Sequence, residues 1–112
     1  EHFAGAFPIW LAPTQVIILP ITDHQVEYVE KIAERLNQEN FRFEKDLRNE
    51  KIGFKIREAQ LAKIPYAIIL GEKEVETGKI AVRRRKSKET RTMDLEEFIS
   101  ELKKAETEKA LD

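Results

Sequence analysis

The stretch Asp46-Leu-Arg-Asn-Glu-Lys-Ile-Gly-Phe-Lys-Ile-Arg-Glu-Ala-Gln-Leu-Ala-Lys63 decides how the whole chain is expected to fold. It predicts the end of a strand, a tight turn, and then a helix from about residue 49 or 50 to 62. Arg48, Asn49 and Lys51 cluster where that helix is expected to begin. A helix N-terminus has unpaired N–H groups and a partial positive charge, so it favours phosphate or polar base edges. We interpret the rest of the chain as the scaffold that holds this helix start, or as a second surface that faces it.

One glycine falls inside this expected helix. Ile52, Ile56 and Ala59 predict a single buried stripe, and Phe54 lies off it. Gly53 costs about 1 kcal/mol there relative to alanine. The cost indicates either that another group approaches the backbone closely or that the helix makes a plain packing contact.

Two continuous apolar runs flank this stretch and predict buried strands. Gln15–Pro20 is rich in β-branched residues, and Tyr66–Leu70 is equally apolar. Between them, a capping box of Thr22 and Gln25 predicts a helix, and residues 41–46 alternate as a second strand does. The order strand–helix–strand–helix–strand predicts right-handed crossovers and a parallel core.

The second half of the chain is strongly charged. Residues 72–78 predict a charged turn, 79–85 an alternating strand and 90–93 a short extended piece. Asp94 and Glu97 predict the cap of a last helix. We therefore expect an α/β fold, with a mixed, largely parallel sheet of about five strands flanked by three helices.

Composition limits the classes of function. A chain of 112 residues is one domain, and 37% charged residues is high. Because 20 cationic and 21 acidic side chains leave a net charge of −1, nucleic-acid binding needs charge concentrated locally. The absence of cysteine excludes disulfides and zinc–sulfur sites and suits a cytoplasmic protein. No apolar run approaches membrane-spanning length.

No catalytic constellation stands out. The chain has no glycine-rich phosphate loop, and His2 and His24 lack nearby partner sets. Asp46 at a strand end suggests a phospho-receiver domain, but the acidic cluster that receivers place after their first strand is missing. The alternating acids of residues 72–76 are typical of a solvated turn. We expect no catalytic residues and no metal site.

Several segments together resemble a known family: Glu1–Pro8, Trp10–Pro13, Asp46–Ala59, Pro65-Tyr66, Gly71 with Lys73–Glu76, and Val82-Arg83. The chain resembles the C-terminal anticodon-binding domain of class II aminoacyl-tRNA synthetases, and among them the bacterial threonyl-tRNA synthetase branch. Gly53–Ala59 is shared more loosely with the prolyl, histidyl and glycyl relatives and indicates only the fold. Asp46–Gly53 together with Trp10–Pro13 is specific to the threonyl branch. Arg84–Arg91 departs from the family, because its hairpin contains no glycine.

The resemblance implies a domain organisation. Residues 1–13 form a connector from a missing catalytic domain, 14–106 the anticodon-binding domain, and 107–112 a frayed tail. This fragment is then not an enzyme by itself and needs no cofactor, since ATP and zinc belong to the catalytic domain. Dimerisation belongs there too, so we expect the isolated domain to be a cytoplasmic monomer without membrane contact.

The resemblance also implies the partner, which is threonine tRNA, and the residues that contact it. Threonine anticodons share guanine and uracil as second and third letters. By position, the residues that recognise them are Asn49, Lys51, Glu74 and Arg83. A carboxylate suits the donors on guanine, and arginine offers a planar fork to acceptors. We expect these four on one rim of the sheet, with further contacts to the RNA backbone from Arg48, Lys63, Arg84 and Arg85.

Alternatives stay open for each of these residues. Asn49 is equally explained as a helix cap, Lys51 and Glu74 as surface charges, and Arg83 as an edge-strand residue that discourages aggregation. Solvated surface charge explains the four backbone candidates as well as RNA does. An alternative function is a protein–protein interaction module of the same fold, with the apolar cluster of residues 7–10 as its interface.

Overall fold

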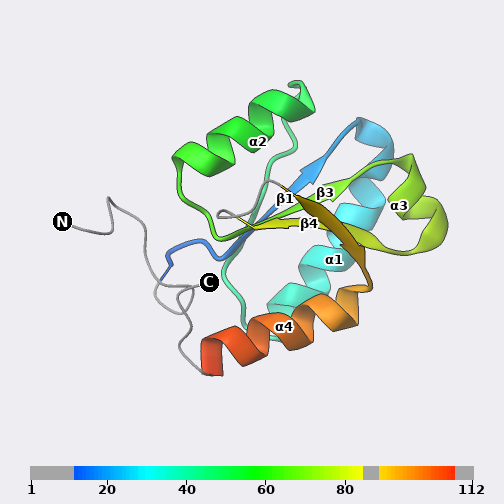
Figure 1. Cartoon of the computed structure of the whole chain (residues 1–112). Helices are drawn as coiled ribbons and strands as arrows, with labels where there is room; N and C mark the ends of the chain where they lie inside the picture. The colour runs from blue at the N-terminus through cyan, green and yellow to red at the C-terminus, as the bar shows by residue number, and fades with distance from the viewer. Residues whose placement is uncertain (1–11, 85–88, 108–112) are drawn as a thin grey trace.

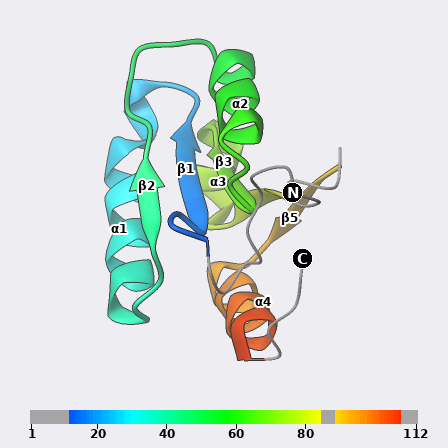
Figure 2. The same ribbon diagram turned by 90° about the vertical axis from the view of Figure 1, so that its left-hand side faces the viewer.

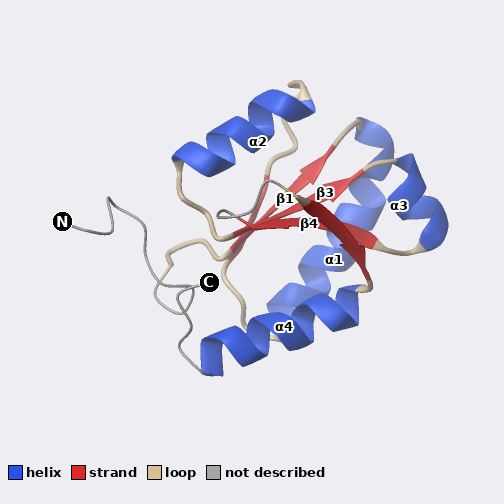
Figure 3. Ribbon diagram, viewed as in Figure 1, coloured by secondary structure: helices blue, strands red, loops and turns tan. Residues whose placement is uncertain are grey.

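The structure, a computed structural model, describes residues 12–84 and 89–107. The described strands are β1 Val16–Pro20, β2 Phe43–Lys45, β3 Tyr66–Leu70, β4 Ile80–Arg84 and β5 Thr90–Met93. The helices are the 3₁₀ turn η2 Asp23–Gln25, α1 Val26–Gln38, α2 Ile52–Leu61, α3 Glu72–Thr77 and α4 Leu95–Thr107. Helices cover both faces of the sheet (Figures 1 and 3). None of the described helices is long and apolar enough to cross a membrane.

The five strands form one sheet in the order β2-β1-β3-β4-β5. β1 pairs in parallel with β2 and β3, while β4 runs antiparallel between β3 and β5. Four strands therefore point the same way and only β4 is reversed. This confirms the predicted mixed, largely parallel α/β sheet. Every residue of β1 is buried, because neighbouring strands pair with both of its edges and helices cover both of its faces.

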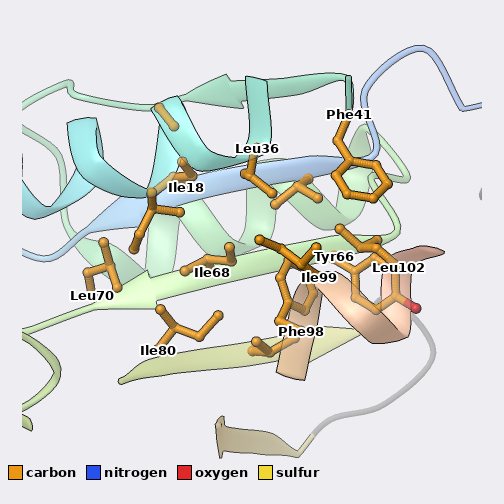
Figure 4. Close-up of a cluster of buried hydrophobic side chains, with 14 of the residues drawn as sticks. Ile18, Leu36, Phe41, Tyr66, Ile68, Leu70, Ile80, Phe98, Ile99 and Leu102 are labelled. Carbon is orange, nitrogen blue, oxygen red and sulfur yellow. The ribbon is translucent and has the colours of Figure 1, made fainter. Parts of the chain in front are cut away.

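Alternation along the strands divides the core in two. Ile18 and Ile68 point to the face covered by α1 and α4, and Figure 4 shows this larger cluster around Phe98. Ile17 and Ala67 point to the opposite face, where they meet the buried stripe of α2. As Figure 1 shows, α2 is alone on its face, with α1 and α4 on the other.

The predicted charged turn at residues 72–78 is wrong, because residues 72–77 form α3. The described part of the chain thus has four α-helices, one more than the predicted three. The side chain of Glu74 accepts the N–H of Gly71, and Gly78 ends the helix at φ 71°, a conformation that favours glycine. No residue of α3 is buried, so the sequence carries no apolar period there that would predict a helix.

Two further predictions about the quoted stretch need correction. α2 begins at Ile52 instead of residue 49 or 50, because Lys51 is still extended at φ −65° and ψ 143°. A Cβ added at Gly53 would meet no atom within 4 Å, so neither a close approach nor a packing contact within the described protein explains this glycine. The connector segment 1–11, Arg85 and the tail from residue 108 lie outside the described residues.

Candidate nucleic-acid interface

The segment of residues 46–51, which joins β2 to α2, crosses the carboxyl edge of the sheet (Figure 2). Its start is tied down, because the N–H of Asp46 donates to the carbonyl of Ile18 at 3.0 Å. Asp46 is 8% exposed and accepts a two-pronged bond from Arg48, with Nε–Oδ1 at 2.9 Å and Nη2–Oδ2 at 2.8 Å. Arg48 also pairs with Glu58 on α2. These three side chains, which we call the Arg48 ion-pair cluster, fold the segment back onto the helix.

The contacts of the Arg48 ion-pair cluster shift the pKa values of Asp46 and Arg48. Hydrogen bonds from Arg48 hold the pKa of the Asp46 carboxyl below its ordinary value. Its bonds to Asp46 and Glu58 raise the pKa of the guanidinium further. The guanidinium also lies over the ring of Phe54, 5.7 Å from its centroid. Asp46 and Arg48 are thus charged at neutral pH.

A second tie comes from Lys55, a residue that is only 2% exposed. Its ammonium donates to the carbonyls of Pro20 and Asp46, both at 3.1 Å, and so joins the ends of β1 and β2. Sequence reasoning missed this lysine. The signal was its position, because Lys55 stands three residues after Ile52 and four before Ala59, within the buried stripe of α2.

Asn49 and Lys51 are exposed on this segment. Lys51 occupies the N-cap position of α2, and no side chain caps that helix end. The interpretation of Asn49 as a helix cap is therefore wrong. Neither side chain has a hydrogen-bond partner within the described residues, so both polar groups face solvent at the carboxyl edge.

Glu74 lies at the same edge, directly after β3. The residue is half-buried, and its Oε1 accepts the N–H of Gly71 at 2.7 Å. A Cβ at residue 71 would lie 3.0 Å from Cδ1 of Ile21 and 3.2 Å from that carboxylate, so only glycine fits without a shift. Burial raises the pKa of Tyr28, and the negative charge of Glu74 raises it further. Glu74 is thus a structural cap with one oxygen left over, and not a plain surface charge.

Arg83 does not lie at this edge. It pairs with Ala67 near the start of β3, about 10 Å below the carboxyl end at 3.3 Å per residue. The structure therefore brings Asn49, Lys51 and Glu74 to one edge but places Arg83 lower on the sheet. β4 has neighbours on both sides, so the interpretation of Arg83 as an edge-strand residue is wrong.

The candidates for backbone contacts are also spread out. Arg83 and Arg84 both line a small depression with Ile56 and Gln60 on the α2 face. The guanidinium of Arg84, however, points to the other face, where it pairs with Glu101 and lies 5.9 Å from the ring centroid of Tyr66. The side chains of Arg83 and Arg84 thus lie on opposite sides of the sheet.

A groove of about 550 Å³ runs along α2 on the side of β2. Arg48 lines one part of it, and Lys63, just beyond the C-terminal end of α2, lines another. Lys45 and Lys55 add positive charge, and Glu44, Asp46 and Glu58 add negative charge. This mixed lining gives the groove no strong preference for an anion. Among the described residues, no cluster of His, Asp or Glu is suited to hold a metal ion.

Comparison with known proteins agrees with this geometry. Residues 15–105 match the family described as "Anticodon binding domain". The threonine–tRNA ligase of Clostridium acetobutylicum is 59% identical over 99 residues, covering 88% of this chain and 16% of the ligase. That of Clostridium botulinum strain Hall is 58% identical over 103 residues, covering 92% and 16%. The chain therefore spans only 16% of the length of these curated relatives.

A solved structure is similar throughout. The RNA-binding domain of threonyl-tRNA synthetase from Cryptosporidium parvum matches with a TM-score of 0.87 at 29% identity. The match covers 100% of this chain and 27% of that one. At this identity the likeness extends beyond the arrangement of the sheet to the sequence that builds it.

Proposed function

This chain belongs to the anticodon-binding domain family, and on that premise we propose that it recognises the anticodon loop of threonine tRNA. The observation that carries the proposal is the exposed pair Asn49 and Lys51. Other polar groups of the same segment are hydrogen-bonded within the protein, either in the Arg48 ion-pair cluster or to Lys55. The fold does not use the side chains of Asn49 and Lys51 for hydrogen bonds within its described residues. Proteins recognise unpaired loop bases in RNA through exposed polar groups of this kind.

Glu74 and Arg83 complete the proposed set. Oε1 of Glu74 is taken by Gly71, which leaves the second oxygen to accept from the pairing edge of guanine. Arg83 lies lower on the α2 face, and an RNA loop whose bases are splayed apart reaches both levels. We propose Arg83 for a uracil acceptor or a phosphate, because its planar fork suits either.

The proposal extends to the rest of the protein. Lys63 and Arg85 are the remaining backbone candidates, whereas Arg84 turns to the opposite face and is not assigned a contact. The catalytic part of a threonine–tRNA ligase is the covalent partner, and it supplies the ATP and zinc chemistry in the cytoplasm. This domain contributes recognition, as a monomer without membrane contact.

The test is binding of the chain to threonine tRNA and to the same tRNA with its second anticodon letter changed, at two salt concentrations. Arg83→Ala is compared with Arg84→Ala, since both remove one charge from adjacent residues on opposite faces. We expect Arg83→Ala to weaken cognate binding about 5- to 150-fold, the cost of a lost base contact. Arg84→Ala is expected to change it less than threefold.

The alternative function predicts a different binding result. Equal binding of both tRNAs by the unaltered chain, with little salt dependence, would favour the protein–protein interaction module. A null result is repeated with the complete ligase, where the catalytic part adds contacts to the same tRNA.

A further inference from the structure

We propose that Arg48 is a positioning residue, which presents Asn49 and Lys51 to the RNA and does not itself bind phosphate. The inference rests on the proposed function and reassigns the role that the sequence suggests for this arginine. Arg48 would then keep residues 49–51 in the conformation that presents them to the RNA.

The guanidinium of Arg48 already has acidic partners within the protein. Nε and Nη2 of Arg48 donate to the two oxygens of Asp46, and Nη2 also donates to Glu58. Three of the five N–H groups of an arginine are thereby used. With two carboxylates around one guanidinium, the cluster carries a net negative charge. A phosphate approaching it meets two carboxylates and finds the Nε and Nη2 side of the guanidinium already occupied.

The Arg48 ion-pair cluster connects the end of β2 to α2. Asp46 is anchored to the sheet through its own N–H to Ile18, and its carbonyl accepts from Lys55. Glu58 belongs to α2, so Arg48 joins the end of a strand to the helix. The residues between these ties are Asn49, Glu50 and Lys51.

The backbone of this short span is fixed at both ends. The N–H of Glu50 donates to the carbonyl of Arg48 at 2.9 Å, which makes a tight turn. The carbonyl of Lys51 accepts the N–H of Lys55 at 3.1 Å, which starts α2. Asn49 and Lys51 are therefore held in place before any RNA arrives, and binding does not have to order them.

The experiment compares variants of the full chain for affinity, salt slope and discrimination between threonine tRNA and its anticodon-changed form. Arg48→Ala is expected to weaken cognate binding about tenfold with little effect on the changed tRNA, so discrimination falls. The salt slope is expected to stay constant. Asp46→Asn is expected to cause a similar loss although every cation remains, and the double variant is expected to be no worse than either single one. Arg48→Lys is expected not to restore discrimination, because lysine cannot form the two-pronged bond.

A phosphate contact predicts the reverse pattern. Arg48→Ala would then lower the log–log salt slope by about 0.7 and weaken both tRNAs equally. Asp46→Asn would leave binding unchanged or tighten it by freeing the arginine, and Arg48→Lys would restore much of it. A purely structural role would lower the fraction of active protein and leave the discrimination ratio intact. Either pattern overturns the proposal.

Two further variants keep the test decisive. Glu58→Gln removes only the exposed ion pair between Arg48 and Glu58. This variant replaces Asp46→Asn in the test if the Asp46 variant does not fold. Positioning predicts weaker discrimination for it, whereas a phosphate contact predicts tighter binding. Glu34→Gln on α1 is the matched control for the same change in charge. If the unaltered chain does not discriminate between the tRNAs, the proposed function fails, and that outcome is distinct from failure of the positioning role.

Discussion

The carboxylate of Glu74 accepts the backbone N–H of Gly71 at 2.7 Å, so a residue proposed to recognise RNA also begins α3. Glycine offers no side-chain oxygen in return, so only this half of a capping box forms. The same carboxylate would sit 3.2 Å from any Cβ at residue 71, which ties the choice of glycine to the placement of Glu74. The start of α3 and the proposed recognition of RNA therefore depend on the same side chain.

Two substitutions at Glu74 separate its roles. Glu74→Ala removes the bond to Gly71 and is expected to lower the free energy of unfolding by about 0.5–1.5 kcal/mol, the net value of one hydrogen bond. Glu74→Gln keeps an oxygen that accepts this N–H and is expected to leave stability nearly unchanged. Both are expected to weaken cognate tRNA binding, because the charged acceptor for guanine is gone. Urea unfolding and tRNA titration measure the two effects, and full binding by the glutamine variant would contradict a role in recognition.

Substitution of the buried Lys55 is expected to change the stability of the fold. Lys55→Met keeps the volume of the side chain but leaves the carbonyls of Pro20 and Asp46 without this donor. We expect the free energy of unfolding in urea to fall by about 1–3 kcal/mol. Lys51→Met, the same change at an exposed site, is expected to stay within about 0.5 kcal/mol of the unaltered chain. Equal stability of the two variants would show that the buried ammonium is not structurally important.

Asp46 makes the stability depend on pH. Arg48 lowers the folded-state pKa of this carboxyl, so its stabilisation is complete above the unfolded pKa of about 3.9 and is lost as pH falls through the folded value. Unfolding free energies measured from pH 7 to pH 2 are expected to show Asp46→Asn less stable at neutral pH. The difference from the unaltered chain is expected to close at the acidic end. A constant difference across this range would mean that the ion pair does not supply it.

Gly53 and Gly78 are expected to respond oppositely to alanine. A Cβ at Gly53 has open space, so Gly53→Ala is expected to stabilise the chain by about 0.5–1 kcal/mol. Gly78 has φ +71°, so Gly78→Ala is expected to destabilise it by about 1–2 kcal/mol. Thermal unfolding of both variants measures the two signs. A loss of stability in the Gly53 variant would show that the start of α2 is shaped by more than local geometry.

Much of the fold was predictable because its signals are local. The apolar runs of β1 and β3 and the capping box of Thr22 and Gln25 all appear in the structure. α3 was not predictable in this way, since a six-residue helix without a buried face leaves no period in the sequence. The start of α2 was placed too early for a related reason. The polar residues before Ile52 resemble a helix cap in the sequence. Their backbone is not helical, and the Arg48 ion-pair cluster holds it in place.

The sequence by itself determined the order of the main elements, the mixed sheet and the family, because residue periods and contiguous motifs carry that information along the chain. Only the tertiary structure decided that Arg83 and Arg84 face opposite sides and that Lys55 is buried between two strand ends. It also decided that Arg48 is held by Asp46 and Glu58. The physical reason is that a side chain's partners are set by sheet register and helix packing, which bring together residues that are distant in the chain.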